Sequence, residues 1–118
     1  MADRVAVVVP DLLFGSKVVE MVRAAGHDPA LVPDVDGLVE LLAAEDVAAI
    51  VADLSEDGAE QAEAIADVRP SGVPVLASFP HVDPEVRAVA LEAGLDQVVP
   101  RSRLSREGGA LLQALLDD

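Results

Sequence analysis

The sequence predicts a doubly wound α/β fold, an open five-stranded parallel sheet in the order 2-1-3-4-5 with helices on both faces. Two observations predict it. Short β-branched runs alternate with segments of helical apolar period, and the connections between them are short, as in parallel sheets with right-handed crossovers. The chain has 118 residues, of which 52% are hydrophobic, so we expect residues 1–118 to form one domain with a sizeable core.

Five apolar runs are interpreted as strands. In chain order they are Val5–Val9, Ala30–Val32, Val47–Val51, Val75–Ala77 and Gln97–Val99. The first and third are apolar without alternation, which is typical of central strands covered on both faces. The second and fifth are shorter, as edge strands often are.

Five segments between and after these runs are interpreted as helices. They are Ser16–Ala25, Val35–Ala44, Gly58–Val68, Pro84–Ala93 and Ser105–Leu116. Asp83 is the expected N-cap of the fourth helix, because an acid before proline is typical of a helix start. Gly26 and Gly94 follow the first and fourth helices, where a residue with positive φ is wanted.

The charge of the chain excludes several functions. Lys and Arg total 8 against 22 Asp and Glu, which gives a net charge of −14. A nucleic acid or an anionic membrane would be repelled by this field. Cysteine is absent, which excludes disulfides and thiolate metal sites. The longest run without Asp, Glu, Lys or Arg, residues 70–82, is shorter than the roughly 18 residues of a membrane span, and no signal-peptide pattern is present, so we expect a cytoplasmic protein.

Charged residues follow three of the predicted strands. Asp11, Asp53 and Arg101 come after the first, third and fifth strands. In a sheet of this order the first and third strands are neighbours, so Asp11 and Asp53 should lie close together. Two nearby carboxylates repel each other, and the site would gain from a hard cation or an arginine. Arg101 is the expected counter-charge.

Two further features have alternative interpretations. His81 follows the fourth strand and could bind a ligand or relay a proton, or it could make one local hydrogen bond. Arg101, Arg103 and Arg106 form the one basic cluster of an acidic sequence. This cluster is either a binding site for an anion or a partner, or it is simply a solvated face of the protein.

Three segments resemble the receiver domain of two-component response regulators. Asp46–Ser55 resembles a third strand that ends in the phosphoacceptor aspartate, Val73–Leu76 resembles the fourth strand, and Ala93–Val99 resembles the approach to the fifth. The resemblance covers nearly the whole chain. It implies the flavodoxin-like, three-layer receiver fold.

The resemblance implies a role for each matching position. Asp53 would be the phosphoacceptor. Asp11, Asp53 and the backbone carbonyl of Ser55 would be magnesium ligands. Ser78 and Arg101 would sense the phosphoryl group.

Four departures from the family pattern predict an incomplete site. Pro10 stands where the family has a second acid, so Mg²⁺ should bind weakly. Strict spacing puts Phe79 at the position of the signalling hydroxyl. Arg101 and Ser102 replace a Lys-Pro pair, and a planar guanidinium does not superimpose on a point-like ammonium. Val98 replaces the aromatic residue of the family's rotamer switch.

Three functions follow from these observations. The first is a stand-alone, non-enzymatic, receiver-like signalling module that acts through protein contacts, with a histidine kinase or a downstream effector as partner. The family's usual contact surface spans the fourth helix, the fifth strand and the fifth helix. The second is a working response regulator that a histidine kinase phosphorylates at Asp53. The third is a small-molecule-binding flavodoxin-like protein, which is disfavoured because no glycine-rich phosphate loop, flavin-type loop or nucleophile-base pair is found.

Overall fold

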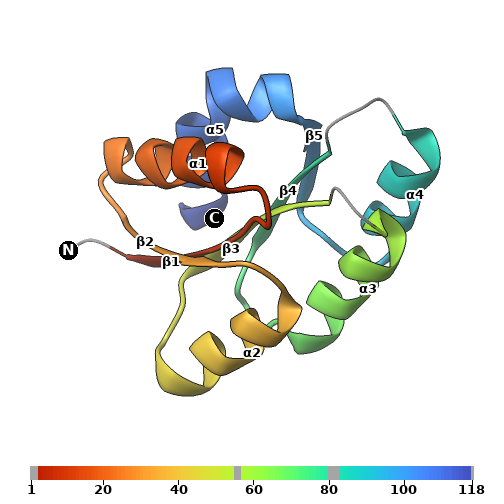
Figure 1. Cartoon of the computed structure of the whole chain (residues 1–118), viewed down its shortest axis with the longest axis horizontal. Helices are drawn as coiled ribbons and strands as arrows, with labels where there is room; N and C mark the ends of the chain where they lie inside the picture. Colours follow the sequence, from red (N-terminus) through yellow and green to blue (C-terminus); the bar gives the residue numbers. More distant parts are fainter. Residues whose placement is uncertain (1–2, 55–56, 80–82, 118) are drawn as a thin grey trace.

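Five strands and five helices alternate along the chain in the computed structural model, which describes residues 3–54, 57–79 and 83–117 (Figure 1). The strands are β1 (Arg4–Val8), β2 (Asp28–Val32), β3 (Ala49–Asp53), β4 (Val75–Phe79) and β5 (Gln97–Pro100). The helices are α1 (Leu12–Ala24), α2 (Val35–Ala44), α3 (Gly58–Val68), α4 (Pro84–Glu92) and α5 (Arg101–Leu116). All strand pairs are parallel and the order is β2-β1-β3-β4-β5, which confirms the predicted fold.

The sheet is covered on both faces. Helices α1 and α5 lie on one face, and α2, α3 and α4 lie on the other (Figure 1). Because successive strand residues point to opposite faces, Val51 and Leu76 pack under α1 and α5, whereas Ala52 and Ala77 belong to the opposite core. By the same alternation, the side chains two residues after Val51 in β3 and two residues after Leu76 in β4 also lie on the face that α1 and α5 cover.

All five strands have bounds that differ from the prediction by one or two residues, and the differences in β3 and β2 matter most. The third strand is Ala49–Asp53, not Val47–Val51, because its ladder starts where Ala49 pairs with Val5 of β1. Strand β2 begins at Asp28 and is as long as β1, so the prediction of a shorter second strand is wrong. Pro29 is tolerated in β2 because an edge strand does not need every N–H in the ladder.

Helix α1 begins at Leu12, four residues before the predicted start at Ser16. The reason is the side chain of Asp11, which caps the helix by accepting the amide protons of its first turn. Gly15 lies inside the helix because α1 passes close to the sheet there. A β-carbon at that position would lie 3.3 Å from Cδ1 of Leu31 in β2.

Helix α5 begins at Arg101, also four residues before the predicted start at Ser105. It follows Pro100 of β5 with no loop between them. Its first turn is polar and shows no helical apolar period, so the sequence pattern predicted a connection there instead of a helix. In the described ranges, no helix has both the length and the apolar character that crossing a bilayer requires.

Candidate functional site

The carboxylate of Asp53 lies at the end of β3 and is completely buried. Ser78 is its register partner on β4 and is equally buried. The Ser78 hydroxyl donates a hydrogen bond of 2.8 Å to Oδ1 of Asp53. Asp53 and Ser78 meet because parallel strands in register put paired side chains on the same face.

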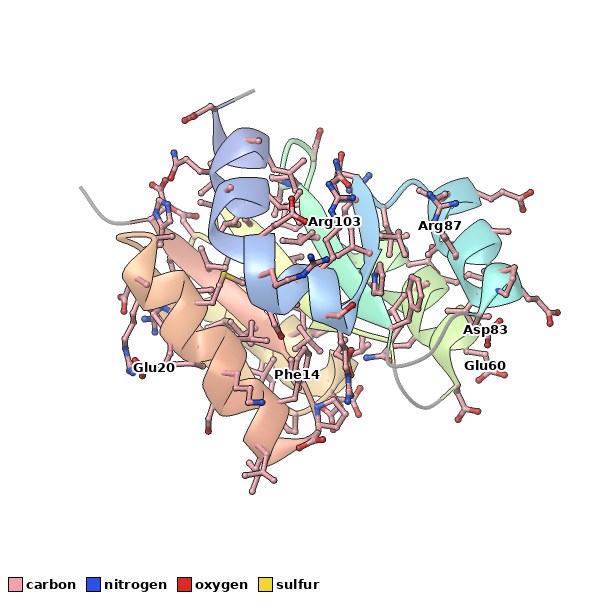
Figure 2. The ribbon with its side chains drawn as sticks, turned by 90° about the horizontal axis from the view of Figure 1, so that it is seen from above. Phe14, Glu20, Glu60, Asp83, Arg87 and Arg103 are labelled. Atoms are coloured by element: carbon pink, nitrogen blue, oxygen red, sulfur yellow. The ribbon has the colours of Figure 1, made fainter. Side chains whose placement is uncertain are left out.

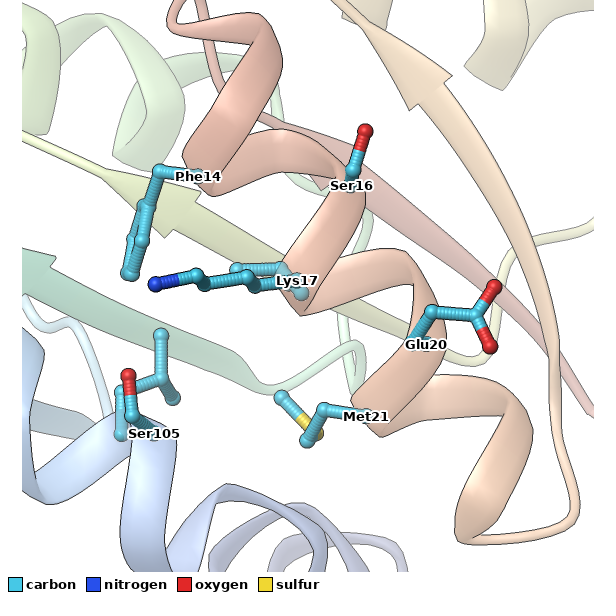
Figure 3. A pocket seen from close by; sticks show the side chains of 8 residues that line it. Phe14, Ser16, Lys17, Glu20, Met21 and Ser105 are labelled. Atoms are coloured by element: carbon cyan, nitrogen blue, oxygen red, sulfur yellow. The ribbon is translucent and has the colours of Figure 1, made fainter.

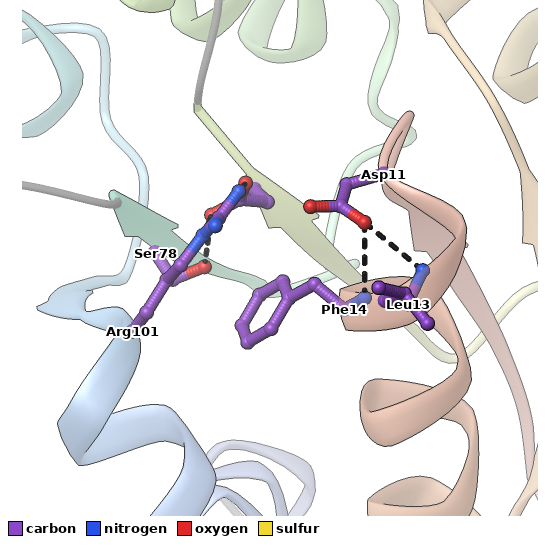
Figure 4. Close-up of polar contacts among 6 residues, drawn as sticks. Asp11, Leu13, Phe14, Ser78 and Arg101 are labelled. Carbon is purple, nitrogen blue, oxygen red and sulfur yellow. Dashed lines mark hydrogen bonds and ion pairs between the residues drawn. The ribbon is translucent and has the colours of Figure 1, made fainter.

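Arg101 completes the surroundings of the Asp53 carboxylate (Figure 4). Its Nε lies 3.0 Å from Oδ1 and 3.1 Å from Oδ2, and its Nη2 donates a further hydrogen bond to Oδ2. The predicted counter-charge is therefore confirmed. Arg101 reaches Asp53 because side chains in the first turn of a helix point back toward its N-terminus, which here faces the carboxyl edge of the sheet.

The guanidinium of Arg101 is held on a second side by an aromatic ring. Its Cζ lies 4.4 Å from the centroid of the Phe14 ring, a cation–π contact. Figure 4 shows the ring reaching from α1 toward Arg101. Sequence reasoning did not identify this role of Phe14. Its place in the first turn of the helix after β1, at the same sheet edge as Arg101, was the available signal.

Hydrogen bonds to Asp53 raise the pKa of Arg101 above its usual value. Partial burial opposes the rise, and Coulomb attraction to Asp53 and then Asp11 adds to it. The guanidinium is therefore charged at every ordinary pH, and Asp53 always faces a cation.

Asp11 lies near this site but its side chain is already engaged. Oδ1 accepts the amide protons of Leu13 at 2.9 Å and Phe14 at 3.2 Å (Figure 4). Asp11 therefore fixes the first turn of α1 and, through it, the position of the Phe14 ring. Its Coulomb effect on Arg101 is consistent with the predicted proximity of Asp11 and Asp53.

The described residues do not fit a divalent cation. Pro10 supplies no carboxylate, Asp11 caps a helix, and Asp53 is paired with Arg101. In the described part of the chain, no group of three His, Cys, Asp or Glu is placed to hold a metal ion. Ser55 and His81, the two other predicted site residues, lie outside the described residues.

Phe79 and Val98 lie on the other side of the sheet. Both belong to the core under α2, α3 and α4, with exposed fractions of 4% and 5%. Strict family spacing gave Phe79 the place of the signalling hydroxyl, yet the hydroxyl that touches Asp53 is that of Ser78, one residue earlier. Val98 is a small buried side chain with no aromatic ring to turn.

The arginines of the predicted basic cluster have separate partners. Arg101 binds Asp53, Arg103 lies 3.3 Å from Glu107, and Arg106 donates to the carbonyl of Ser102 at 3.3 Å. Arg103 and Arg87 project from different helices in the view of Figure 2. Arg101 is thus the cluster member that reaches the Asp53 carboxylate.

Comparisons of this chain with known proteins give different results by sequence and by structure. No family model matches this sequence, and no curated protein matches it. Solved structures do match. The chain superimposes on a response regulator from Thermotoga maritima with a TM-score of 0.87 and 14% identity, covering 100% of both chains. The chain has the receiver-domain fold.

Two further solved structures match this fold. A receiver domain of a sensor histidine kinase from Pseudomonas aeruginosa, with magnesium coordinated in its active-site cleft, has a TM-score of 0.82 and 20% identity, with 100% of both chains covered. An atypical orphan response regulator, whose structure revealed a phosphorylation-independent regulatory mechanism, has a TM-score of 0.80 and 16% identity, covering 97% of this chain and 95% of that one. At such identities the likeness is one of fold, and function has to be argued from the site.

Proposed function

We propose that this chain is a receiver-like signalling module that acts through protein contacts and does not depend on phosphorylation of Asp53. One observation carries the proposal. The Asp53 carboxylate is fully buried, and both of its oxygens accept hydrogen bonds from Arg101. The site is thus held in one arrangement by charges within the chain.

The ion pair opposes phosphoryl transfer to Asp53. An attacking carboxylate oxygen must approach a phosphorus atom in line, and the developing charge must be neutralised, chiefly by a metal ion and a cation. Here Oδ1 would first have to leave Ser78 and Arg101, or Oδ2 would have to leave Arg101. The described residues also offer too few free carboxylates for a metal, so we expect Mg²⁺ to bind more weakly than millimolar.

A protein partner is the expected recipient of the signal. Leu12 and Leu13, in the first turn of α1 beside the Asp53 site, are 75% and 82% exposed. Exposed large apolar side chains next to a fixed polar site are typical of contact surfaces. A histidine kinase or a downstream effector remains the class of partner that the fold favours. The matching orphan regulator, with its phosphorylation-independent mechanism, supports this mode of action.

Acetyl phosphate with Mg²⁺ tests the proposal. We expect slow labelling or none in the wild type, measured by intact mass. Arg101→Lys is the informative variant, because a single ammonium leaves one carboxylate oxygen freer, and it should label faster than the wild type. Beryllofluoride, a mimic of the phosphoryl group, should shift amide signals only near residues 11, 53 and 101.

A working phosphoacceptor is the second candidate, and the Ser78 hydroxyl at Asp53 favours it. Stoichiometric labelling of the wild type that disappears in Asp53→Asn would establish it. Spread of the beryllofluoride shifts through α4 and β5 would point to the same conclusion. Either result would replace the proposed function with that of a conventional response regulator.

A further inference from the structure

An apolar groove lies between α1 and α5, on the helix side that faces away from the sheet (Figure 3). Its volume is about 430 Å³, inside the range of about 300–1,000 Å³ that small-molecule pockets occupy. The apolar side chains that line it are Phe14, Val18, Met21 and Leu104. Of these, Val18 and Leu104 are almost fully buried and form a rigid floor, whereas the unbranched Met21 can adapt to an occupant.

The polar groups at this groove are few, and one of them is a cation. Lys17 is the single lysine of the chain. In the view of Figure 3 its side chain extends from α1 with the ammonium toward the Phe14 ring, and Ser105 lines the same groove from α5. Within the described residues, the Lys17 ammonium takes part in no ion pair. Glu20, the acid that lines the groove, is paired with Arg23 at 2.9 Å.

The charge of the chain limits what can occupy the groove. An unpaired ammonium above apolar walls suits an occupant with an anionic end and an apolar body. A polyanionic partner, such as an acidic helix, would meet the field of a net charge of −14. Among anionic ligands, one with a single negative charge is repelled least by that field, and its apolar body supplies the affinity.

We infer that the groove binds a free amphiphilic monocarboxylate. The carboxylate lies at the Lys17 ammonium and the Ser105 hydroxyl, and the apolar tail lies on Val18, Met21 and Leu104. This inference is independent of the proposed protein-contact function. It also gives Phe14 two neighbours, the ligand in the groove and the Arg101 guanidinium beyond it.

Decanoate and decanol, which share a tail and differ in the charge of the head, are the probes. Both are titrated into the full chain below the micelle concentration and followed by amide chemical shifts. We expect decanoate to shift signals of residues 14–21 and 104–105. Lys17→Gln should weaken decanoate about fivefold and leave decanol unchanged, because only the charged head meets Lys17. Arg87→Gln is the matched control, because it removes an exposed cation far from the groove residues in sequence, on α4. It should change neither affinity.

Ser105→Trp fills the groove from an exposed position and should abolish binding of both probes while leaving the fold intact. Equal affinity for decanoate and decanol, with no effect of Lys17→Gln, would overturn the inference and reduce the groove to a nonspecific apolar patch. Shifts centred on other helices, or none up to millimolar decanoate, would overturn it too. Lys17-dependent sedimentation with phosphatidylglycerol vesicles, without binding of free decanoate, would assign the groove to a membrane instead. Labelling by acetyl phosphate is measured separately, so failure here leaves the proposed function standing.

Discussion

Arginine-aspartate pairs lie at both ends of the sheet, and two of them differ in the burial of the carboxylate. At the carboxyl end of the strands, Arg101 binds Asp53; at the amino end of β4, Arg69 binds Asp96 at 2.7 Å. The two arginine side chains are nearly equally exposed, at 26% and 25%. The carboxylates are not, because Asp53 is completely buried whereas the Asp96 side chain is 37% exposed.

The difference in carboxylate burial distinguishes two kinds of ion pair. One only fastens elements of the fold together, whereas the other makes a locked site, in which a buried carboxylate is held away from water. Asp96 also accepts the amide proton of Val75 at 2.8 Å, and Arg69 donates to the carbonyl of Gly94 at 2.7 Å, so this pair fastens the end of α3 to β4 and β5. Water can replace either partner. Asp53 has no such substitute, because it is completely buried, its charge is balanced by Arg101, and its Oδ1 accepts a hydrogen bond from Ser78. We therefore expect variants at the Asp53 end to have the larger effects.

Arg101→Ala should have the largest effect. Removing one partner of a buried pair leaves an uncompensated charge, and we expect the free energy of unfolding to fall by about 3 kcal/mol, at the lower end of the usual range because Arg101 is partly exposed. Arg69→Ala is the matched control, and its loss should be under about 1 kcal/mol. Urea denaturation measures both. Equal losses would mean that water reaches Asp53 and that the site is not locked.

Ser78→Ala tests the hydrogen bond that the serine hydroxyl donates to the Asp53 carboxylate. A hydrogen bond to a buried charge contributes about 1.5–2 kcal/mol, so the unfolding free energy should fall by that amount. Ser16→Ala removes an exposed hydroxyl that donates to the carbonyl of Leu12 at 2.9 Å, and should cost less than about 0.5 kcal/mol. If the two serine variants were equally stable, Arg101 alone would satisfy Asp53.

The pH dependence of Arg101→Lys tests the same charge. Because the folded pKa of Arg101 is raised, its contribution is present below the unfolded pKa and is lost only as the pH rises through the folded value, far above the working range. The sequence has no Tyr or Cys and one Lys, so few other groups titrate at alkaline pH. A lysine beside Asp53 would also have a raised pKa, and between about pH 10 and 11 this variant should lose roughly 0.7 kcal/mol more than the wild type. Parallel stability curves for the two proteins would show that the pair adds no stability.

The sequence predicted the sheet order and the charge pair, but not the way in which the pair is built. Alternating β-branched and helical segments are a strong signal, and strand order placed Asp53 and Arg101 at one edge. Both missed helix starts have the same cause. In neither first turn does a helical apolar period mark the start. Helix α1 begins at Leu12 because the preceding residue caps it, and α5 begins at Arg101 because β5 continues directly into it.

The choice between Ser78 and Phe79 needed the strand register. Asp53 pairs with Ser78, so the two side chains share a face, and Phe79 must point to the opposite core. Counting residues along one strand gives no such information. The contact of Phe14 with Arg101 depends on where two helices begin, which explains why no sequence pattern revealed it.

The smallest expected effect concerns Phe14 and isolates its contact with Arg101. A partly exposed cation–π contact contributes about 0.5–1 kcal/mol, and a double-mutant cycle of Phe14→Leu with Arg101→Ala should give a coupling energy of that size. The chain offers its own control, because it has one other phenylalanine. Phe79→Leu removes the same ring from the opposite core, on the other face of the sheet, and its cycle with Arg101→Ala should give no coupling. Urea denaturation of the six proteins gives both energies. Equal coupling in the two cycles would mean that the ring of Phe14 only fills space, and that Arg101 is held at Asp53 by the carboxylate and the hydroxyl alone.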